Sequence, residues 1–169
     1  ELGADRICVC DTCGHVTPNG TRKLLEFIQE EVIHDAGVKR RDIEVNWHGH
    51  QDRGLGVANN LAAVEAGADV IHGTALGVGE RAGNAALQEV VMTLDTRQDR
   101  LPYYTGVVAT EIYPSSRLLC EVTRSPVQSH KAIVGRNAFA HEAGIHQDGV
   151  LKNTRTYEIM TPQSVGVAG

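Results

Sequence analysis

Two histidines that follow a short apolar run have the spacing of metal ligands. Residues 43–47 include β-branched and aromatic side chains and lie between a charged and a glycine-rich segment, which predicts a strand. Because alternate side chains of a strand share a face, His48 and His50 can both point at one cation. The alternative is a hydrogen-bonded pair of histidines at a strand end. Asp52, which could orient a ligand imidazole, and the glycines after it favour a metal site.

A second polar cluster, in residues 77–84, follows a later predicted strand. Its glycines do not have the G-x-G-x-x-G spacing of a dinucleotide-binding loop, so we disfavour a nucleotide site there. A tight turn explains the glycines, because glycine adopts positive φ without a steric penalty. A turn alone does not explain why Glu80, Arg81 and Asn84 occur together at a strand exit. These three residues favour a functional site.

The segments that position these residues alternate between strand and helix patterns. The sequence predicts a strand followed by a helix three times, in residues 1–11, 19–35, 43–47, 54–66, 70–76 and 85–94. Short connections in such an alternation predict parallel strands with helical crossovers. Each polar or glycine-rich loop falls after a strand and before a helix. Such loops form the catalytic face of a closed (β/α) barrel, or line the crevice of an open doubly wound sheet.

A short internal repeat indicates that the chain starts within a fold. Residues 65–71 repeat residues 1–7 in position and character. In the second copy a glycine closes a predicted helix just before a strand, which is a common helix ending. The first copy therefore predicts the tail of a helix before its strand, and we expect the chain to begin in the middle of a larger α/β domain.

The sequence changes in character towards its C-terminal part. Residues 95–102 are a charged connector, and residues 111–122 predict a helix that Pro114 interrupts early. A Ser-Pro step within residues 124–127 marks a boundary. We therefore predict two domains, residues 1–123 and residues 124–169.

A polar segment without clean periodicity, residues 137–153, lies in the second predicted domain. Such a segment is more often a site than a core. It contains two histidines. We interpret His141 as an ordinary, partly exposed side chain, and we single out His146 as a candidate for chemistry.

Composition argues against several classes of protein. The chain has 169 residues, of which 41% are hydrophobic, so it is long enough for a domain with a real core. Its net charge of −5 and its lack of a Lys/Arg cluster argue against nucleic acid as a partner. No apolar run reaches the length of a spanning helix and no signal peptide is visible, so we expect no membrane partner. We expect Cys8 and Cys10 to be small buried side chains of a strand rather than zinc or iron–sulfur ligands with Cys13.

Three motifs, taken in order, give the chain a specific resemblance. They are His-Gly-His-x-Asp at 48–52, Gly-Thr-x-x-Gly-x-Gly-Glu-Arg-x-Gly-Asn-Ala at 73–85, and Gly-Ile-His-Gln-Asp-Gly-Val-Leu-Lys at 144–152. Over almost its whole length the chain resembles the 2-isopropylmalate synthases of the alpha-isopropylmalate/homocitrate synthase family, whose catalytic domains are metal-dependent, pyruvate carboxyltransferase-like TIM barrels. The resemblance implies an α/β fold. It would be the C-terminal part of a TIM (β/α)8 barrel, with its last three βα units, a crossover helix and the start of a helical linker subdomain.

The resemblance also implies roles for residues of the barrel. His48 and His50 would bind a divalent metal, which could be Mn, Mg, Zn or Co. Asn84 would complete the environment of the metal, directly or through water. Thr12 would hold the carboxylate of a 2-oxoacid, and Glu80 would line the same pocket.

Two residues of the linker would complete the site. His146 resembles the histidine that reaches into the barrel of the other subunit of a homodimer and assists deprotonation of acetyl-CoA, and Tyr157 matches a tyrosine of the same region. A thioester methyl group is a very weak acid, so its deprotonation needs a positioned base, and histidine suits that role. The implied reaction is the condensation of acetyl-CoA with 3-methyl-2-oxobutanoate to 2-isopropylmalate and CoA, an acyl transfer of leucine biosynthesis in the cytoplasm.

The chain departs from the family pattern at Gln51, where Asn is usual, and at Arg53, where an apolar residue is common. The family's first strand, which carries a metal-binding aspartate and an adjacent arginine, has no counterpart in these residues. We therefore expect the chain alone to bind metal weakly and not to turn over. Homocitrate or citramalate synthase is the alternative with the same chemistry. An aldolase or lyase of the same barrel superfamily and a non-catalytic fragment are further alternatives.

Overall fold

The structure, a computed structural model, describes residues 3–153 and 156–167. It divides into two compact units, the first up to residue 90 and the second from residue 91. We describe each unit by itself. The predicted helix tail at the start of the chain falls on residues 1 and 2, outside the described residues.

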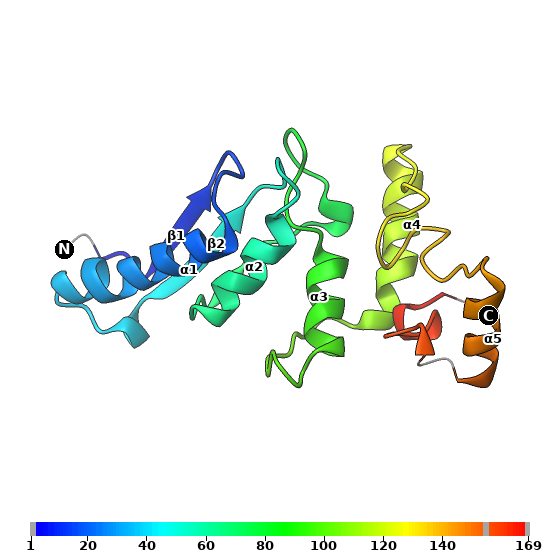
Figure 1. The fold of residues 1–169 in the computed structure, drawn as a ribbon. Coiled ribbons are helices and arrows are strands. Elements are labelled where there is room, and N and C mark those ends of the chain that lie inside the picture. The colour runs from blue at the N-terminus through cyan, green and yellow to red at the C-terminus, as the bar shows by residue number, and fades with distance from the viewer. Residues whose placement is uncertain (1–2, 154–155, 168–169) are drawn as a thin grey trace. The chain divides into compact units, whose positions relative to one another are not determined.

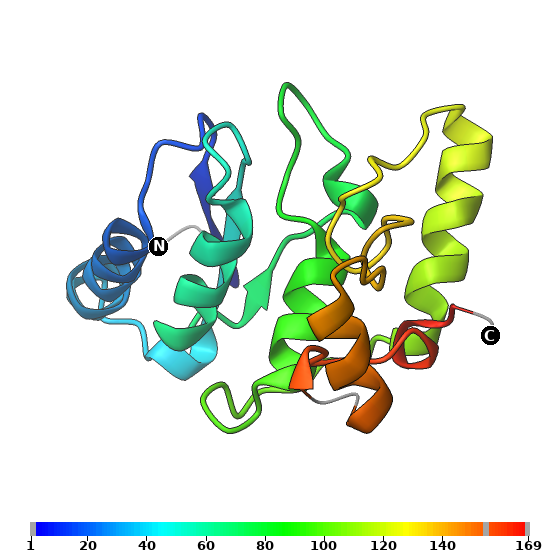
Figure 2. The same ribbon diagram turned by 45° about the vertical axis from the view of Figure 1, so that its right-hand side comes forward.

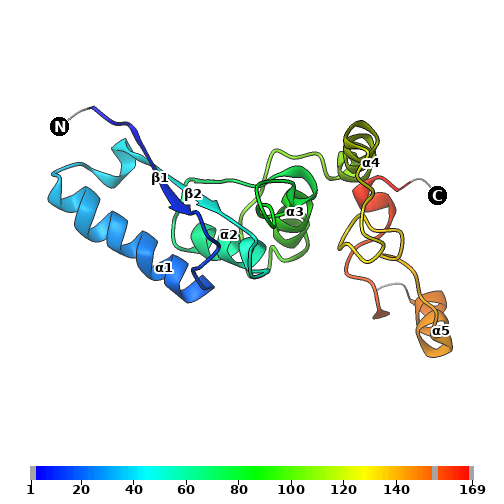
Figure 3. The ribbon, with the colours of Figure 1, turned by 90° about the horizontal axis from the view of Figure 1, so that it is seen from above.

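The first unit is built on a parallel three-stranded sheet in the order β1-β2-β3. Helices α1 and α2 connect the strands and lie side by side on the same face of the sheet (Figures 1 and 3). The elements are β1 (Arg6–Asp11), α1 (Pro18–Phe27), β2 (Glu44–Gly49), α2 (Gly56–Glu65) and β3 (Val70–Ile71). The predicted alternation of parallel strands and crossover helices is therefore confirmed.

The core of this unit lies between the sheet and its helices. β2 is the central strand, so both of its edges are paired, and its Val45 and Trp47 have no solvent exposure. They pack in one apolar cluster with Leu25 of α1 and Ala63 of α2. Burial of these side chains fixes the position of β2, and hence of the histidines at its end.

Helix α1 begins where its sequence predicts. The side chain of Thr17 accepts a hydrogen bond from the backbone N–H of Gly20 at 3.3 Å, and Pro18 occupies the first helical position. The helix continues as a π-helical segment, Ile28–Ile33, and then through helical residues to Asp35. The predicted helix over residues 19–35 is confirmed in extent.

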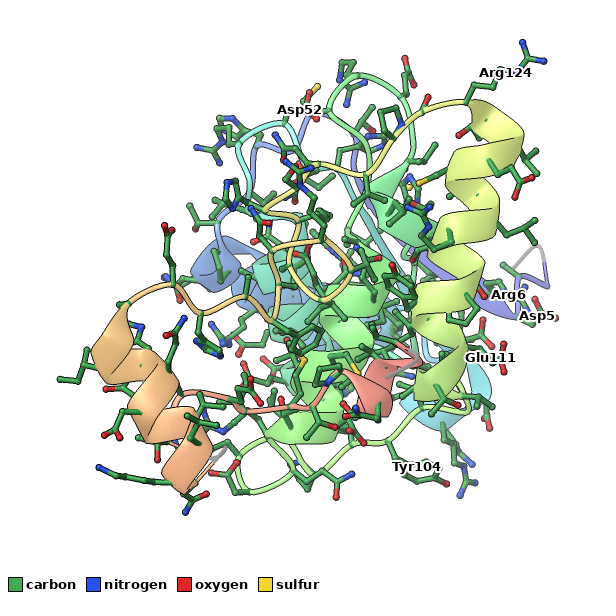
Figure 4. All side chains as sticks on the ribbon, turned by 90° about the vertical axis from the view of Figure 1, so that its right-hand side faces the viewer. Asp5, Arg6, Asp52, Tyr104, Glu111 and Arg124 are labelled. Carbon is green, nitrogen blue, oxygen red and sulfur yellow. The ribbon has the colours of Figure 1, made fainter. Side chains whose placement is uncertain are left out.

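The two ends of the sheet differ. Figure 4 shows Asp52, which follows β2, at the end opposite to Asp5 and Arg6, which precede or begin β1. At the end where the strands start, the Arg40 guanidinium donates hydrogen bonds to the carbonyl oxygens of Ile43 and Gly67 and to the Asp69 carboxylate, at 2.7–2.8 Å. The loops that carry the predicted site residues lie at the other end, where the strands finish.

Three predictions of local structure are wrong. The strand predicted over residues 70–76 ends at Ile71, because the backbone turns into the 3-10 helix Ala75–Gly77, in which Leu76 has φ 58°. Pro114 does not interrupt its helix, because it lies in the first turn, where its missing N–H is not needed. Cys8 and Cys10 are exposed, because they lie on the face of β1 that neither α1 nor α2 covers.

The regular elements among the described residues of the second unit are helices. Helix α3 (Leu87–Thr96) crosses the boundary between the units, and α4 (Ile112–Thr123) and α5 (Gly144–Lys152) follow. The 3-10 helix Gln163–Val165 lies beside the start of α4 (Figure 2), where Gly166 approaches the carbonyl oxygen of Thr110. Among the described residues, no helix combines the length and the apolar character needed to cross a bilayer.

Candidate functional site

The two histidines at the end of β2 point towards each other. The Nε2 atoms of His48 and His50 are 3.3 Å apart, and their ring centroids are 5.1 Å apart. Two nitrogen ligands with metal–nitrogen bonds of about 2.1 Å and this separation would enclose an angle of about 100° at the ion. That angle lies between those of octahedral and tetrahedral coordination. The pair therefore fits neighbouring ligands of one cation.

The environment of this pair favours the neutral form of the His48 imidazole. Burial lowers the pKa of His48, and the neighbouring imidazoles of His72 and His50 lower it further. A neutral ring retains a lone pair, which a metal ligand needs. His50 is 7% exposed, and its Nδ1 is buried without a hydrogen-bond partner in the described part of the chain.

Asn84 joins the histidines from the loop after β3. Its backbone forms an antiparallel bridge with His50, and its side-chain Nδ2 donates to the Gly49 carbonyl oxygen at 3.3 Å. Two glycines make this approach possible. A Cβ on Gly79 would lie 2.1 Å from the Asn84 Oδ1, and Gly83 has φ 89° and leaves no room for a side chain. The turn predicted from these glycines is confirmed, and it brings three predicted metal-site residues together.

A third imidazole, which the sequence analysis did not single out, belongs to the same cluster. The Nδ1 of His72 lies 3.2 Å from the Nδ1 of His48, and the ring centroids are 5.3 Å apart. The register of β2 with β3 is the feature that would have revealed this contact. Trp47 pairs with Ile71, so the residues that follow them lie side by side: His48 on β2 and His72 just after β3.

Asp52 does not orient an imidazole, contrary to the prediction. Its carboxylate accepts hydrogen bonds from Arg81 at 2.8 and 3.1 Å. These bonds hold the pKa of Asp52 below its ordinary value and raise that of Arg81. Arg81 also donates to the backbone carbonyl of Thr12. It therefore links the loops after all three strands, and the sequence did not reveal this role.

Arg53 makes a second link between loops. It donates to the backbone carbonyls of Gly14, at 3.2 Å, and of His15. Gln51 instead makes a hydrogen bond within its own loop, because its Oε1 accepts from the backbone N–H of Gly56 at 2.6 Å. The two departures from the family pattern therefore have structural roles beside the histidines.

Thr12 and Glu80 lie in the linked loops and are exposed. Glu80 is 80% exposed, and its carboxylate lies 3.7 Å from the guanidinium of Arg81. The structure thus places both side chains at the end of the sheet where His48 and His50 lie. Their roles with a substrate stay predictions.

The two linker residues meet in the second unit. The ring centroids of His146, on α5, and Tyr157 are 4.3 Å apart. Gly149, three residues after His146, makes room for the Tyr157 ring, which a Cβ there would meet at 2.5 Å. His141 is half-buried, and its Nε2 lies 3.0 Å from the Glu158 carboxylate.

The histidine pair is an incomplete set of metal ligands. Among residues 3–153 and 156–167, no three His, Cys, Asp or Glu side chains gather so that they could hold an ion. The His48 and His50 nitrogens could fill two coordination positions around one cation, and the Asn84 amide lies next to them. Further ligands would come from water, from substrate, or from residues outside this chain.

Comparison with known families identifies the family to which the chain belongs. The family model HMGL-like matches residues 1–119, and the model Homocitrate synthase post-HMGL domain-like matches residues 133–169. The chain therefore belongs to the HMGL-like family. Within it, the chain is 53% identical, over 99% of its length, to a 2-isopropylmalate synthase of Methylobacterium nodulans, and 49% identical, also over 99%, to one of Oceanobacillus iheyensis. It spans 31% and 32% of the lengths of these relatives.

Solved structures agree on the fold. An HMG-CoA lyase from Acinetobacter baumannii, in complex with coenzyme A and 3-methylmalate, matches 84% of this chain and 45% of its own length with a TM-score of 0.62 at 24% identity. The Bacillus subtilis HMG-CoA lyase matches 76% of this chain and 41% of its own length with a TM-score of 0.59 at 23% identity. The chain is thus part of an α/β barrel of the TIM type.

Proposed function

We propose that this chain is part of a metal-dependent acyltransferase that condenses acetyl-CoA with 3-methyl-2-oxobutanoate to give 2-isopropylmalate and CoA, in leucine biosynthesis. The observation that carries the proposal is the 3.3 Å separation of the His48 and His50 Nε2 atoms at the end of one strand of a parallel sheet. The identity of about 50% to 2-isopropylmalate synthases supports the choice of reaction. Cytoplasmic location stays a prediction.

The proposed metal site consists of His48, His50 and Asn84. A divalent cation there, Mn, Mg, Zn or Co, would supply Lewis-acid polarisation of the 2-oxoacid carbonyl. The histidines would hold the cation through their Nε2 atoms, which already face each other. Asn84 would complete the environment, directly or through water.

Loop residues would bind the oxoacid. We assign the carboxylate of the substrate to Thr12, whose backbone Arg81 holds through a hydrogen bond to the carbonyl. Glu80 would line the same pocket. Arg81 would itself contribute order rather than charge, because Asp52 already neutralises its guanidinium.

His146 would act as the base that deprotonates the methyl group of acetyl-CoA. Tyr157, whose ring lies against His146, would orient that imidazole or the thioester. We propose that His146 serves the barrel of a partner subunit, which requires a homodimer. In this arrangement the barrel part covers the last three βα units and residues 124–169 begin the linker.

Two features weigh on the alternatives. The match of residues 133–169 to a homocitrate synthase domain that follows the barrel supports a condensing enzyme over a lyase. Homocitrate synthase and citramalate synthase remain the alternative enzymes, because they differ from 2-isopropylmalate synthase in the oxoacid rather than in the chemistry. The non-catalytic reading is weaker, because the histidine pair and the loops around it are intact.

The test measures CoA release by the full-length gene product with a panel of 2-oxoacids. We expect the highest kcat/KM with 3-methyl-2-oxobutanoate. Cleavage of a hydroxyacyl-CoA without any oxoacid would identify a lyase instead. His48→Ala and His50→Ala should each remove bound metal and activity, whereas His34→Ala, an exposed histidine of the first unit, should change neither. Full metal content in both site variants would overturn the proposal.

A further inference from the structure

The backbone of His72 is fixed beside β2. Its N–H donates to the Trp47 carbonyl at 2.9 Å, and its own carbonyl accepts from the Asn60 Nδ2 at 2.7 Å. Trp47 and Asn60 have no solvent exposure. These two hydrogen bonds to buried residues therefore fix the position of the His72 backbone, from which its imidazole extends.

The His48 ring uses its two nitrogens on different neighbours. Its Nδ1 faces the Nδ1 of His72 at 3.2 Å, and its Nε2 faces the Nε2 of His50 at 3.3 Å. A neutral imidazole has one N–H and one lone pair, so one of these contacts is made by a donor and the other by an acceptor. If the proton of His48 is on Nδ1, its Nε2 lone pair points at the position between His48 and His50.

From this geometry we propose that His72 is a positioning residue for the metal. It accepts a hydrogen bond from the Nδ1–H of His48, which holds His48 in the tautomer whose Nε2 can bind the cation. The inference rests on the proposed metal site. In the part of the chain that the structure describes, His72 is the one recorded partner of the His48 Nδ1.

The two proposed ligands are therefore supported differently. A ligand imidazole normally donates its second N–H to a carboxylate, a backbone carbonyl or water. His48 has the His72 imidazole in that place, whereas the His50 Nδ1 is buried without a partner among the described residues. His72 adds no negative charge to the site. It selects a tautomer and a ring orientation.

The experiment uses the metal-free full-length protein and Co²⁺ as the probe. Affinity comes from titration, and the visible absorption of bound Co²⁺ reports its ligand geometry. His72→Leu removes the acceptor, while His72→Asn keeps an oxygen near the place of Nδ1. We expect His72→Leu to weaken Co²⁺ binding at least about tenfold and to change the spectrum, because loss of such a partner typically costs 10–100-fold. His72→Asn should retain most of the affinity, and His34→Leu should leave affinity and spectrum unchanged.

A second measurement needs no substitution at position 72. Solid-state ¹⁵N NMR of the unmodified metal-free protein with labelled histidine, with the His48 signals assigned by their loss in His48→Gln, reports which nitrogen is protonated. We expect a protonated Nδ1 on His48. An unprotonated Nδ1, or equal Co²⁺ affinity and spectra in His72→Leu and the unmodified protein, would overturn the proposal.

Failure of this inference is distinguishable from failure of the proposed function. If His48→Ala and His50→Ala abolish Co²⁺ binding while His72→Leu has no effect, the metal site stands and the role of His72 is wrong. If the two alanine variants bind Co²⁺ as the unmodified protein does, the metal site itself is wrong, and the role of His72 is wrong with it.

Discussion

Free space at single residues decides whether Asn84 reaches the histidines. Gly83 combines φ 89° with a backbone contact so close that an added Cβ would lie 1.9 Å from the Gly77 carbonyl oxygen. Gly37 also has positive φ, at 71°, but nothing lies within 4 Å of the position of its Cβ. Substitution of Gly37 by alanine therefore costs only backbone strain, whereas substitution of Gly83 costs backbone strain and a steric clash.

We predict that Gly83→Ala destabilises the protein more than Gly37→Ala does. The left-handed conformation alone costs an alanine about 1 kcal/mol, which is the loss expected at Gly37. Gly83→Ala adds the collision and displaces Asn84, so it should also weaken binding of a divalent cation. Urea unfolding and cation titration of the full-length protein measure the two effects. Equal losses of stability in the two variants would contradict the prediction.

At the scale of elements, two arginines connect the loops after the three strands by hydrogen bonds. Arg81 connects the loop after β3 with Asp52 and with Thr12, and Arg53 connects the loop after β2 with the carbonyls of the loop after β1. Because each loop follows a parallel strand, the sheet sets their spacing and the guanidinium groups fix their fine positions.

Loss of the Arg81 link should therefore loosen substrate binding. We predict that Arg81→Met raises KM for the 2-oxoacid roughly tenfold or more, because Thr12 loses its anchor. Steady-state kinetics with the full-length enzyme measure this. Arg22→Met is the matched control, since Arg22 pairs with Glu65 between α1 and α2 and touches none of the loops. An unchanged KM in Arg81→Met would exclude the anchoring role.

The opposite end of the sheet should affect stability without affecting the site. Arg40 makes four hydrogen bonds in fixed directions, which a lysine cannot reproduce. We predict that Arg40→Lys lowers the free energy of unfolding by about 1–2 kcal/mol. Cation affinity of the folded protein should be the same as before. A change in affinity would show that the two ends of the sheet are coupled.

Local patterns in the sequence predicted most of the elements and the approach of His48 and His50. The strand preceding them has a clear apolar run, and two residues on one face of a strand end must lie close. The contact of His72 with His48 follows from the register of β2 with β3, and the pairing of Asp52 with Arg81 follows from the course of two loops. Neither can be read from spacing along the chain. The early end of β3 likewise follows from the turn at Leu76, which has positive φ without being a glycine.

At the scale of the whole molecule, the chain is about a third of the length of its relatives. The histidine pair lacks a carboxylate partner for a cation in the described part of the chain. We predict that the 169 residues produced alone bind divalent cations weakly and release no CoA from acetyl-CoA, whereas the full-length gene product binds cations more tightly and releases CoA. Cation titration and a thiol assay, run on both proteins, decide this. CoA release by the isolated chain would refute it.

Within the described residues, β1 pairs with β2 and with no other strand. The other side of β1 thus offers unpaired amide and carbonyl groups, which can act as a template for strand addition by a neighbouring chain. Samples of the isolated piece should consequently self-associate as their concentration rises, which light scattering would reveal. Attaching the upstream residues of the gene product should suppress that behaviour by covering the edge.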